Sequence, residues 1–432
     1  MEKFVIRGGV PLSGELTTAG NKNAALPLIA ACLLTDEDVT LHRVPRIRDV
    51  EAQIALLERL GAEVEWVADN SLRLRAATVN GAEVDEDLSS KIRASFLLAG
   101  PLLARFGEAH MPPPGGDFIG RRRLDAHLDA FEDLGARVGG DRWIDVTAPP
   151  TGLRPSSIFM DEPSVMGTEN ALMAAALTPG PTTIANAASE PHVQDLARLL
   201  AAMGAQVDGI GSNVMTVHGR DKLGGAEHTL CPDHIEVASF MALAAATGGE
   251  LRVLDAQPAD LVMIRRQFRR LGLQAVEQGE DIIVPPNQNL RVQADVGGAT
   301  PKIEDGPWPA FPADLTSIAV ALATQAEGTI MIFEKMFENR LFFVDKLVAM
   351  GARITICDPH RALVTGPSRL HGERLESPDI RAGMAMLIAA LAADGVSEIG
   401  NIRQIDRGYE QIDDRLRALG AHLERVGAEV PA

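Results

Sequence analysis

The chain has little cysteine, and its three cysteines, Cys32, Cys231 and Cys357, stand far apart. No C-x-x-C pair and no histidine cluster accompanies them, so the sequence predicts neither a metal site nor a disulfide framework. Cys32 lies inside the apolar stretch AALPLIAACLL, where we expect a buried packing residue. No apolar run reaches the roughly 18–20 residues that a membrane helix needs. The first residues, MEKFVIRGG, have a strand pattern and not that of a signal peptide, so we expect a cytoplasmic protein.

Positive charge is also in short supply. The chain has 41 Lys and Arg against 59 Asp and Glu, a net charge of −18. That balance argues against a general nucleic-acid binder, which would need a basic face. Hydrophobic residues make up 46% of the sequence, which is typical of a globular protein. At 432 residues the chain is too long for one ordinary core, and we expect two domains.

One unit recurs six times along the chain. Each copy is the end of an amphipathic helix, an apolar residue, a glycine and the start of a strand. The copies read LERLGAEV, FEDLGARV, LAAMGAQV, FRRLGLQA, LVAMGARI and LRALGAHL, with glycines at positions 61, 135, 204, 272, 351 and 420. The even spacing, 68 to 79 residues, indicates a repeat and not six chance helix ends. We expect each glycine to end its helix in the left-handed conformation.

A second recurring element, an Ala- and Leu-rich helix, precedes each of these units. It is apolar nearly all round, which predicts a helix buried on every face. Six units of two helices and several short strands suggest an α/β protein with two lobes of three units each. A cleft between two lobes is the natural place for a small ligand.

The stretch PPPGGDFIGRRRLD stands out because it sets a single carboxylate, Asp117, on a loop beside three consecutive arginines. The loop runs from Pro112 to Arg123, and its prolines and glycines indicate stiff ends and a mobile tip. Taken alone, Asp117 has the setting of a turn aspartate.

Several basic residues share a setting at or near the start of predicted elements. Helix N-termini present free N–H groups, and an added Lys or Arg makes them a clamp for phosphate or carboxylate. Any one of these residues could be solvated surface charge, but together they predict an anionic ligand. They are Lys22, Arg93, Arg122, Arg340, Arg381 and Arg407, with Asn23 next to Lys22.

Asp314 complements these cations. It lies in WPAFPADLTS, close to the start of the fifth apolar helix. Aspartate is a favoured N-cap, so spacing alone leaves both a capping role and a chemical role open.

These motifs occur together, in order and spacing, in one known family. The strings are NKNAALP, RASFLLAGPLLARFG, GGD-x-IG-x-R, PSV…TENALMAAA, PDHIE, FPADL, FENR, DIRAG and IDRGYE. Along essentially its whole length the chain is similar to the UDP-N-acetylglucosamine 1-carboxyvinyltransferase (enolpyruvyl transferase) family. The related shikimate-pathway enolpyruvyl transferases share that fold, but their GNAGT signature is absent here.

The resemblance implies a two-lobe inside-out α/β barrel, which is α/β (α+β) in class. It has six repeated βαββαβ-like units, three per lobe, with the active site in the cleft between the lobes. Residues 22–230 would form one lobe, which carries the mobile loop of residues 112–123. Residues 1–21 and 231–432 would form the other.

The resemblance also implies a reaction. The enolpyruvyl group of phosphoenolpyruvate is transferred to the 3-hydroxyl of UDP-N-acetylglucosamine by addition and elimination, and phosphate leaves. This is the first committed step of peptidoglycan synthesis, and it needs no metal or organic cofactor. The implied partners are these two small molecules, without nucleic acid or membrane insertion.

Residue roles follow from the same resemblance. Arg340 and Arg381 would bind the substrate carboxylate, and Asp314 would be the base that takes the hydroxyl proton. Asp117 stands where most of the family has cysteine, so it would be the proton donor, and the enzyme should be insensitive to fosfomycin. Lys22, Arg122 and Arg407 would bind the phosphate. Further substrate contacts would come from Asn23, Arg93, Arg123, Leu124, Asp125, His127, Ser164, Val165, Met166 and Asp379.

Three departures from the family pattern concern the nucleotide sugar and the hinge. Arg123 replaces a usual proline, Met166 enters the S-V-G-A-T-E-N motif, and PDHIEVAS replaces PDRIETGT. They leave open an enolpyruvyl transferase that acts on another nucleotide sugar. A shikimate-3-phosphate-type enzyme and a catalytically silent, anion-binding repeat protein are also left open. The sequence does not predict an oligomeric state.

Overall fold

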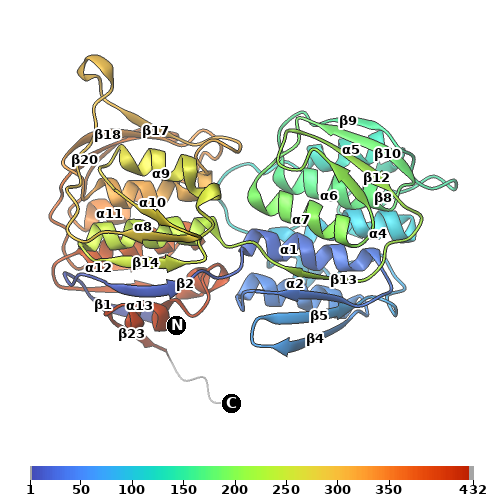
Figure 1. Ribbon diagram of the computed structural model, residues 1–432, viewed down its shortest axis with the longest axis horizontal. Helices are drawn as coiled ribbons and strands as arrows, with labels where there is room; N and C mark the ends of the chain where they lie inside the picture. The colour runs from blue at the N-terminus through green and yellow to red at the C-terminus, as the bar shows by residue number, and fades with distance from the viewer. Residues whose placement is uncertain (1, 428–432) are drawn as a thin grey trace. The chain divides into compact units, whose positions relative to one another are not determined.

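The computed structural model describes residues 2–427, which form two compact units of mixed helix and sheet (Figure 1). Unit 1 comprises residues 2–19, Phe118–Arg121 and residues 232–427. Unit 2 comprises Gly20–Asp117 and Arg122–Cys231. Each unit has its own hydrophobic core. The mixed α/β class agrees with the sequence analysis; residues 1 and 428–432 of the predicted lobe lie outside the described part.

Unit 2 contains three sheets, ordered β13-β3-β5-β4, β6-β8-β7 and β11-β12-β10-β9. Its strands are β3 (Val39–His42), β4 (Glu63–Ala68), β5 (Ser71–Arg75), β6 (Glu108–Met111), β7 (Arg137–Gly139), β8 (Ile144–Thr147), β9 (Ser157–Phe159), β10 (Gly180–Ala185), β11 (Gln206–Asp208), β12 (Val214–Gly219) and β13 (Ala226–Thr229). Its helices are α1 (Lys22–Ala31), η1 (Cys32–Leu34), α2 (Arg48–Arg59), α3 (Glu86–Ser89), η2 (Arg93–Leu98), α4 (Ala99–Phe106), α5 (Asp125–Asp133), α6 (Val165–Ala176) and α7 (Pro191–Ala202).

Unit 1 also contains three sheets, ordered β21-β22-β1-β23, β15-β16-β14-β2 and β17-β18-β20-β19. Its strands are β1 (Lys3–Arg7), β2 (Gly14–Thr17), β14 (Leu251–Leu254), β15 (Val276–Gln278), β16 (Asp281–Val284), β17 (Lys302–Glu304), β18 (Gly328–Phe333), β19 (Arg353–Asp358), β20 (Arg361–Gly366), β21 (Arg374–Glu376), β22 (Val396–Gly400) and β23 (His422–Val426). Its helices are α8 (His234–Thr247), η3 (Pro258–Leu261), α9 (Val262–Arg269), η4 (Val296–Gly298), η5 (Ala313–Leu315), α10 (Thr316–Ala323), α11 (Val344–Ala349), α12 (Ile380–Ala392), η6 (Ile402–Arg407) and α13 (Ile412–Ala418).

The sheets repeat one pattern, as the six sequence repeats predict. In each four-stranded sheet, three antiparallel strands carry a fourth, parallel strand on one edge, as β9 lies beside β10 and β17 beside β18. In the three-stranded sheet that edge is reduced to a single parallel bridge between Glu83 and His110. The first strand of the chain, β1, is the central strand between β22 and β23, so the two ends of the described chain share one sheet.

The six repeat glycines adopt the left-handed conformation that the sequence predicts. Their φ angles lie between +90° and +113°. A residue with a Cβ is strained in that conformation, so glycine is the residue that lets each outer helix turn directly into a strand.

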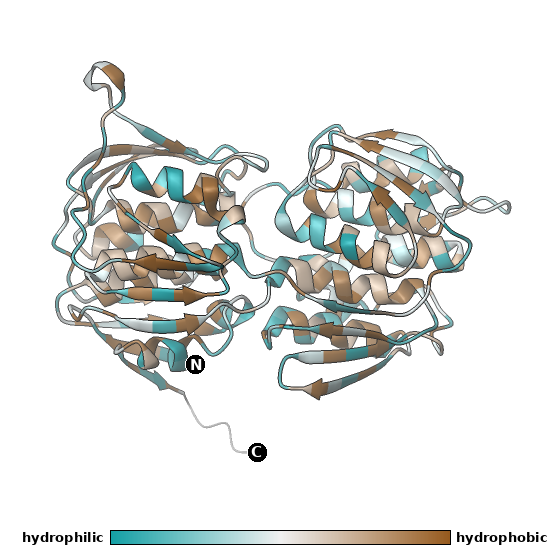
Figure 2. Ribbon diagram, viewed as in Figure 1, coloured by the Kyte–Doolittle hydropathy of each residue, from teal (hydrophilic) through white to brown (hydrophobic). Residues whose placement is uncertain are grey.

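The apolar helices are buried, also as predicted. Every residue of α8 from His234 to Ala245 is buried, as is every residue of α12 up to Leu391. Cys32, next to α1, is 1% exposed, which confirms it as a packing residue. Figure 2 colours these enclosed helices mainly as hydrophobic, whereas teal residues gather on outer helices such as α9. Within residues 2–427, no helix combines the length and the apolar character needed to span a membrane.

Candidate active site

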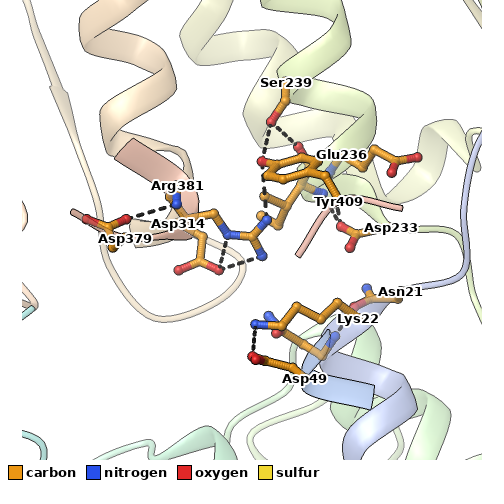
Figure 3. Close-up of polar contacts among 12 residues, drawn as sticks. Asn21, Lys22, Asp49, Asp233, Glu236, Ser239, Asp314, Asp379, Arg381 and Tyr409 are labelled. Carbon is orange, nitrogen blue, oxygen red and sulfur yellow. Dashed lines mark hydrogen bonds and ion pairs between the residues drawn. The ribbon is translucent and has the colours of Figure 1, made fainter. Parts of the chain in front are cut away.

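Asp314 of unit 1 lies between two arginines, Arg340 and Arg381. Figure 3 shows its contact with Arg381. Its Oδ1 atom accepts a hydrogen bond from Nη2 of Arg340 at 2.9 Å, and its Oδ2 atom accepts one from Nε of Arg381 at 3.0 Å. Both arginines are only 4% exposed. Asp314 sits within η5, and the N-caps of η5 and α10 are Pro312 and Leu315. Asp314 is therefore not a helix cap, and of the two roles that its spacing leaves open the structure favours an ionic one.

Arg381 is fixed by several partners. It is the second residue of α12, whose N-cap Asp379 accepts the backbone N–H groups of Arg381 and Ala382 at 2.9 Å. Its Nη1 donates to the hydroxyl of Tyr409 at 3.3 Å, and that hydroxyl lies 3.1 Å from Oγ of Ser239. Burial disfavours the charge of Arg381, but Asp314, Tyr409 and Asp233 together outweigh it and the pKa of the guanidinium is raised. Arg381 is thus held as a cation.

Arg340 faces a second, deeply buried carboxyl group, that of Glu334. Its Nε atom lies 3.8 Å from Oε2 of Glu334, and Glu334 is fully buried. The other oxygen, Oε1, accepts the backbone N–H groups of Met336 and Phe337 at 3.2 and 3.1 Å. Burial raises the pKa of Glu334 to about 8; Arg340 opposes the rise and Asp305 adds to it. At pH 7 burial therefore favours the neutral acid form of Glu334.

Arg407 lies at the end of an element and not at its start. It is the last residue of η6, where its Nη1 donates to Oε1 of Gln404 at 2.8 Å. The expectation that each of the six cations stands near the start of an element is therefore wrong for Arg407. The 3-10 helix ends here because the next residue, Gly408, is its C-cap and leaves the helical conformation. The residues around Arg407 did not indicate this end.

In unit 2, Lys22 is the first residue of α1 and forms a buried ion pair. Its Nζ atom lies 2.9 Å from Oδ2 of Asp49, in the first turn of α2. The preceding residue, Asn21, caps α1 by accepting the backbone N–H groups of Asn23 and Ala24 at 2.9 and 3.3 Å. The cap fixes the backbone direction at Lys22, and Asp49 fixes its ammonium group.

Arg93 is held by backbone carbonyl groups. It is the first residue of η2, and its Nη2 donates to the carbonyl oxygens of Arg122 at 2.6 Å and Arg123 at 3.3 Å. Burial and the neighbouring charge of Arg122 lower the pKa of Arg93 to about 10. Arg93 and Arg122 thus form a concentrated positive patch that is still charged at neutral pH.

The loop that carries Asp117 approaches this patch closely. The N–H of Gly115 donates to the carbonyl of Ser89 at 3.0 Å. Gly116 has φ +107°, and a Cβ there would come within 2.9 Å of Cβ of Arg93, so only glycine fits next to the half-buried Asp117. Further along the loop, Phe118–Arg121 belong to unit 1. There the carbonyl of Ile119 accepts a hydrogen bond from the N–H of Asn339 at 3.0 Å.

The segment that follows the loop is fixed by ion pairs. Nε of Arg123 lies 3.1 Å from Asp125, and its Nη2 lies 3.0 Å from Asp161. The hydrogen bond from Arg123 to Asp125, with help from Asp161, raises the pKa of Arg123. Leu124, at the N-cap position of α5, packs against the unit 2 core.

His127 on α5 is buried and held in one tautomer. Oδ1 of Asn170 accepts the N–H of Gly100 at 2.9 Å, so its Nδ2 is the atom that faces Nδ1 of His127 at 2.8 Å. Nδ2 is a donor, so Nδ1 accepts and the ring proton lies on Nε2. Burial and the charge of Arg93 lower the pKa of His127 to about 3, which keeps the ring neutral.

The start of α6 holds the other predicted contacts of unit 2. Oγ of Ser164 caps the helix by accepting the N–H of Gly167 at 3.2 Å. Val165 and Met166 form the first turn, and both pack against the unit 2 core while remaining partly exposed. Met166 is thus accommodated without a break in the helix.

Four supporting residues were not anticipated from the sequence. Tyr409 could have been noticed, because it is the only tyrosine and lies in the motif IDRGYE. Glu334 stands six residues before Arg340, but nothing local marks it as buried. Asp49 carries no signal, because its partner Lys22 is 27 positions away. Asn170 lies in the motif TENALMAAA, but the motif does not indicate its partner His127, which is 43 positions away.

Comparison with known proteins identifies the class. The family model for EPSP synthase (3-phosphoshikimate 1-carboxyvinyltransferase) matches residues 6–416. The chain belongs to this family of enolpyruvyl transferases, and it is an enzyme that transfers the enolpyruvyl (1-carboxyvinyl) group. Within the family, it is 56% identical to a Bradyrhizobium diazoefficiens protein named UDP-N-acetylglucosamine 1-carboxyvinyltransferase, over 98% of each chain. A Treponema denticola protein of the same name is 52% identical, over 98% of this chain and 99% of its own.

Solved structures agree on the fold. The enolpyruvyl transferase NikO from Streptomyces tendae matches with a TM-score of 0.87 and 25% identity, over 99% of both chains. EPSP synthase from Acinetobacter baumannii matches with a TM-score of 0.73, over 99% of this chain and all of its own, and its 17% identity supports the fold alone. These neighbours confirm the predicted two-lobe inside-out barrel.

Proposed function

We propose that the protein transfers the enolpyruvyl group of phosphoenolpyruvate to the 3-hydroxyl of UDP-N-acetylglucosamine, with release of phosphate. The observation that carries this proposal is the carboxylate of Asp314, held between the buried guanidinium groups of Arg340 and Arg381. The names of the full-length relatives support the choice of acceptor. The reaction would take place in the cytoplasm and serve peptidoglycan synthesis, and with it cell shape and division.

The first chemical step is addition. Asp314 takes the proton of the sugar hydroxyl while the hydroxyl oxygen forms a bond to C2 of phosphoenolpyruvate. Two guanidinium groups stabilise the negative charge that a proton-accepting carboxylate must carry. Asp117 delivers a proton to the methylene carbon C3, so the product of this step is a tetrahedral ketal phosphate.

The second step is elimination. The bond from C2 to the phosphate oxygen breaks, and C3 returns a proton to the carboxylate of Asp117 as the enol ether forms. Arg340 and Arg381 bind the carboxylate of the substrate, whereas Lys22, Arg122 and Arg407 bind the phosphate. Arg93 adds positive charge beside Arg122, which stabilises the phosphate as it departs.

The nucleotide sugar is bound by the remaining motif residues. Asn23, Arg123, Asp125, His127 and Ser164 contact it, together with Leu124, Val165, Met166 and Asp379. Because Asp125 and Asp161 hold the guanidinium of Arg123, this departure from the family pattern offers a fixed side chain to the acceptor. An enzyme that acts on a different nucleotide sugar is the second candidate, and Arg123 is the feature that favours it.

The proposal is tested by measuring phosphate release from phosphoenolpyruvate with UDP-N-acetylglucosamine, and by reading the product mass in parallel. We expect a product heavier by one enolpyruvyl group, formed only when both substrates are present. Turnover with another nucleotide sugar, but not with this one, would move the proposal to the second candidate. Turnover with shikimate 3-phosphate alone would refute it.

A further inference from the structure

Glu334 is a buried carboxyl group to which the proposed mechanism gives no task. It immediately follows β18 and is fully buried, with Oε1 fixed by the N–H groups of Met336 and Phe337. A carboxyl group is costly to bury, and the hydrogen bonds to Oε1 account for only one of its two oxygens.

The second oxygen and one arginine nitrogen face each other without a bond. Oε2 of Glu334 and Nε of Arg340 are both buried and have no hydrogen-bond partner among residues 2–427. They lie 3.8 Å apart, beyond the reach of a hydrogen bond. A neutral acid explains this gap, because its oxygen attracts the Nε–H of Arg340 more weakly than a carboxylate oxygen would.

We propose that Glu334 is a positioning residue that acts through Arg340: as a neutral acid it leaves the guanidinium in place beside Asp314, where it binds the carboxylate of phosphoenolpyruvate, and as a carboxylate it draws the guanidinium away. This inference rests on the proposed function, because it assigns Arg340 to that carboxylate. Ionised Glu334 would close the gap to a charge-assisted hydrogen bond at Nε and neutralise the charge that the substrate needs.

The surroundings of Glu334 keep it in the neutral form near pH 7. Asp305 is 1% exposed and accepts the backbone N–H groups of Lys335 and Met336 beside Glu334, so its charge repels a second negative charge there. His360 binds the backbone carbonyl of Glu334 at 2.7 Å and not its carboxyl group. The groups that face the carboxyl group of Glu334 are Arg340, Asp305 and the hydroxyl of Thr316.

The test is the KM for phosphoenolpyruvate between pH 7 and 9, at saturating acceptor, in the wild type and in Glu334→Gln. In the wild type we expect KM to rise with pH, with a limiting slope of about tenfold per pH unit once Glu334 ionises. Glutamine cannot ionise, so in Glu334→Gln KM should change by less than about twofold, with kcat close to the wild-type value at pH 7. Arg93 also loses charge at alkaline pH, but it does so in both proteins.

Asp413→Asn is the matched control, because Asp413 is a buried carboxylate paired with Arg417 and Arg425 in the same unit. It should keep the wild-type KM profile. Parallel KM profiles in the wild type and Glu334→Gln, or a flat wild-type profile, would overturn the inference. A wild type that forms no enolpyruvyl product would refute the proposed function instead.

Asp305→Asn is a second test of the inference if Glu334→Gln does not fold. Circular dichroism shows whether that variant is folded. Asparagine still accepts the N–H groups of Lys335 and Met336 but carries no charge. Asp305 raises the pKa of Glu334, so its loss should move the rise in KM to lower pH. An unshifted rise would contradict the inference.

Discussion

The two units hold their cations in different ways. In unit 1, Arg340 and Arg381 both hydrogen-bond the carboxylate of Asp314. In unit 2, Arg93 hydrogen-bonds the carbonyl oxygens of Arg122 and Arg123, which carry only partial charge. A carbonyl orients a guanidinium without neutralising it, whereas a carboxylate does both.

The comparison suggests a division of labour. Unit 2 concentrates the positive charge of Arg93 and Arg122 beside the Asp117 loop, which is what a phosphate-bearing substrate needs. Unit 1 pairs its cations with carboxyl groups, which is what controlled proton transfer needs. Lys22 is the exception in unit 2, because Asp49 pairs with it directly.

The largest expected effect comes from Asp314→Asn. Asparagine can still accept a hydrogen bond from an arginine but cannot take a proton, so kcat should fall by about 10³-fold. Steady-state turnover measures this, and a thermal melt checks the fold. Asp394→Asn is the control, because Asp394 is an exposed carboxylate paired with Arg369. It should leave kcat unchanged. A loss smaller than about tenfold would mean that another group is the base.

The next largest effect is expected from Asp117→Cys. A thiol can also donate a proton, so the variant should stay active, but it should lose nearly all activity when incubated with fosfomycin. Mass spectrometry should find an adduct at residue 117 of the variant and none at that residue in the wild type. Full resistance of the variant would show that residue 117 does not lie where the chemistry occurs.

Arg93→Lys tests the carbonyl-held cation of unit 2. An ammonium group cannot reproduce the planar fork of a guanidinium, so KM for phosphoenolpyruvate should rise about 10- to 100-fold. In the wild type, Arg93 is charged below its pKa of about 10, so substrate affinity should weaken as pH approaches that value. Arg142→Lys, at an exposed surface pair with Glu86, is the control. An unchanged KM would show that substrate binding does not need the guanidinium of Arg93. The proposed contrast between carbonyl-held and carboxylate-held cations would then be wrong.

The smallest effect is one on stability, from His127→Gln. The pKa of His127 is about 3 in the fold and about 6.5 when unfolded, so its contribution is present above pH 6.5 and is lost as pH falls toward 3. At pH 5 the free energy of unfolding that has been lost amounts to roughly 2 kcal/mol. Urea unfolding at pH 7 and pH 5 should therefore show a smaller difference for His127→Gln than for the wild type. His371→Gln, at an exposed histidine, should match the wild type.

Several features of the site were predictable because they are local. Lys22, Arg93 and Arg381 begin helices as the motifs indicate, since a helix start is encoded by neighbouring residues. The choice between a capping and a chemical role for Asp314 was not local, because two distant arginines bind its carboxylate. Arg407 was misplaced for a similar reason, since the end of a short 3-10 helix has a weak signal.

Local sequence was enough to predict the repeat, the left-handed glycines at the helix ends and the burial of the apolar helices. These properties depend on residues a few positions apart, through backbone sterics and hydrophobic periodicity. Tertiary structure alone decided which carboxyl group meets which cation: Asp314 with Arg340 and Arg381, Asp49 with Lys22, Glu334 behind Arg340. The physical reason is that such pairs form across packed elements, where burial and distance set charge and protonation.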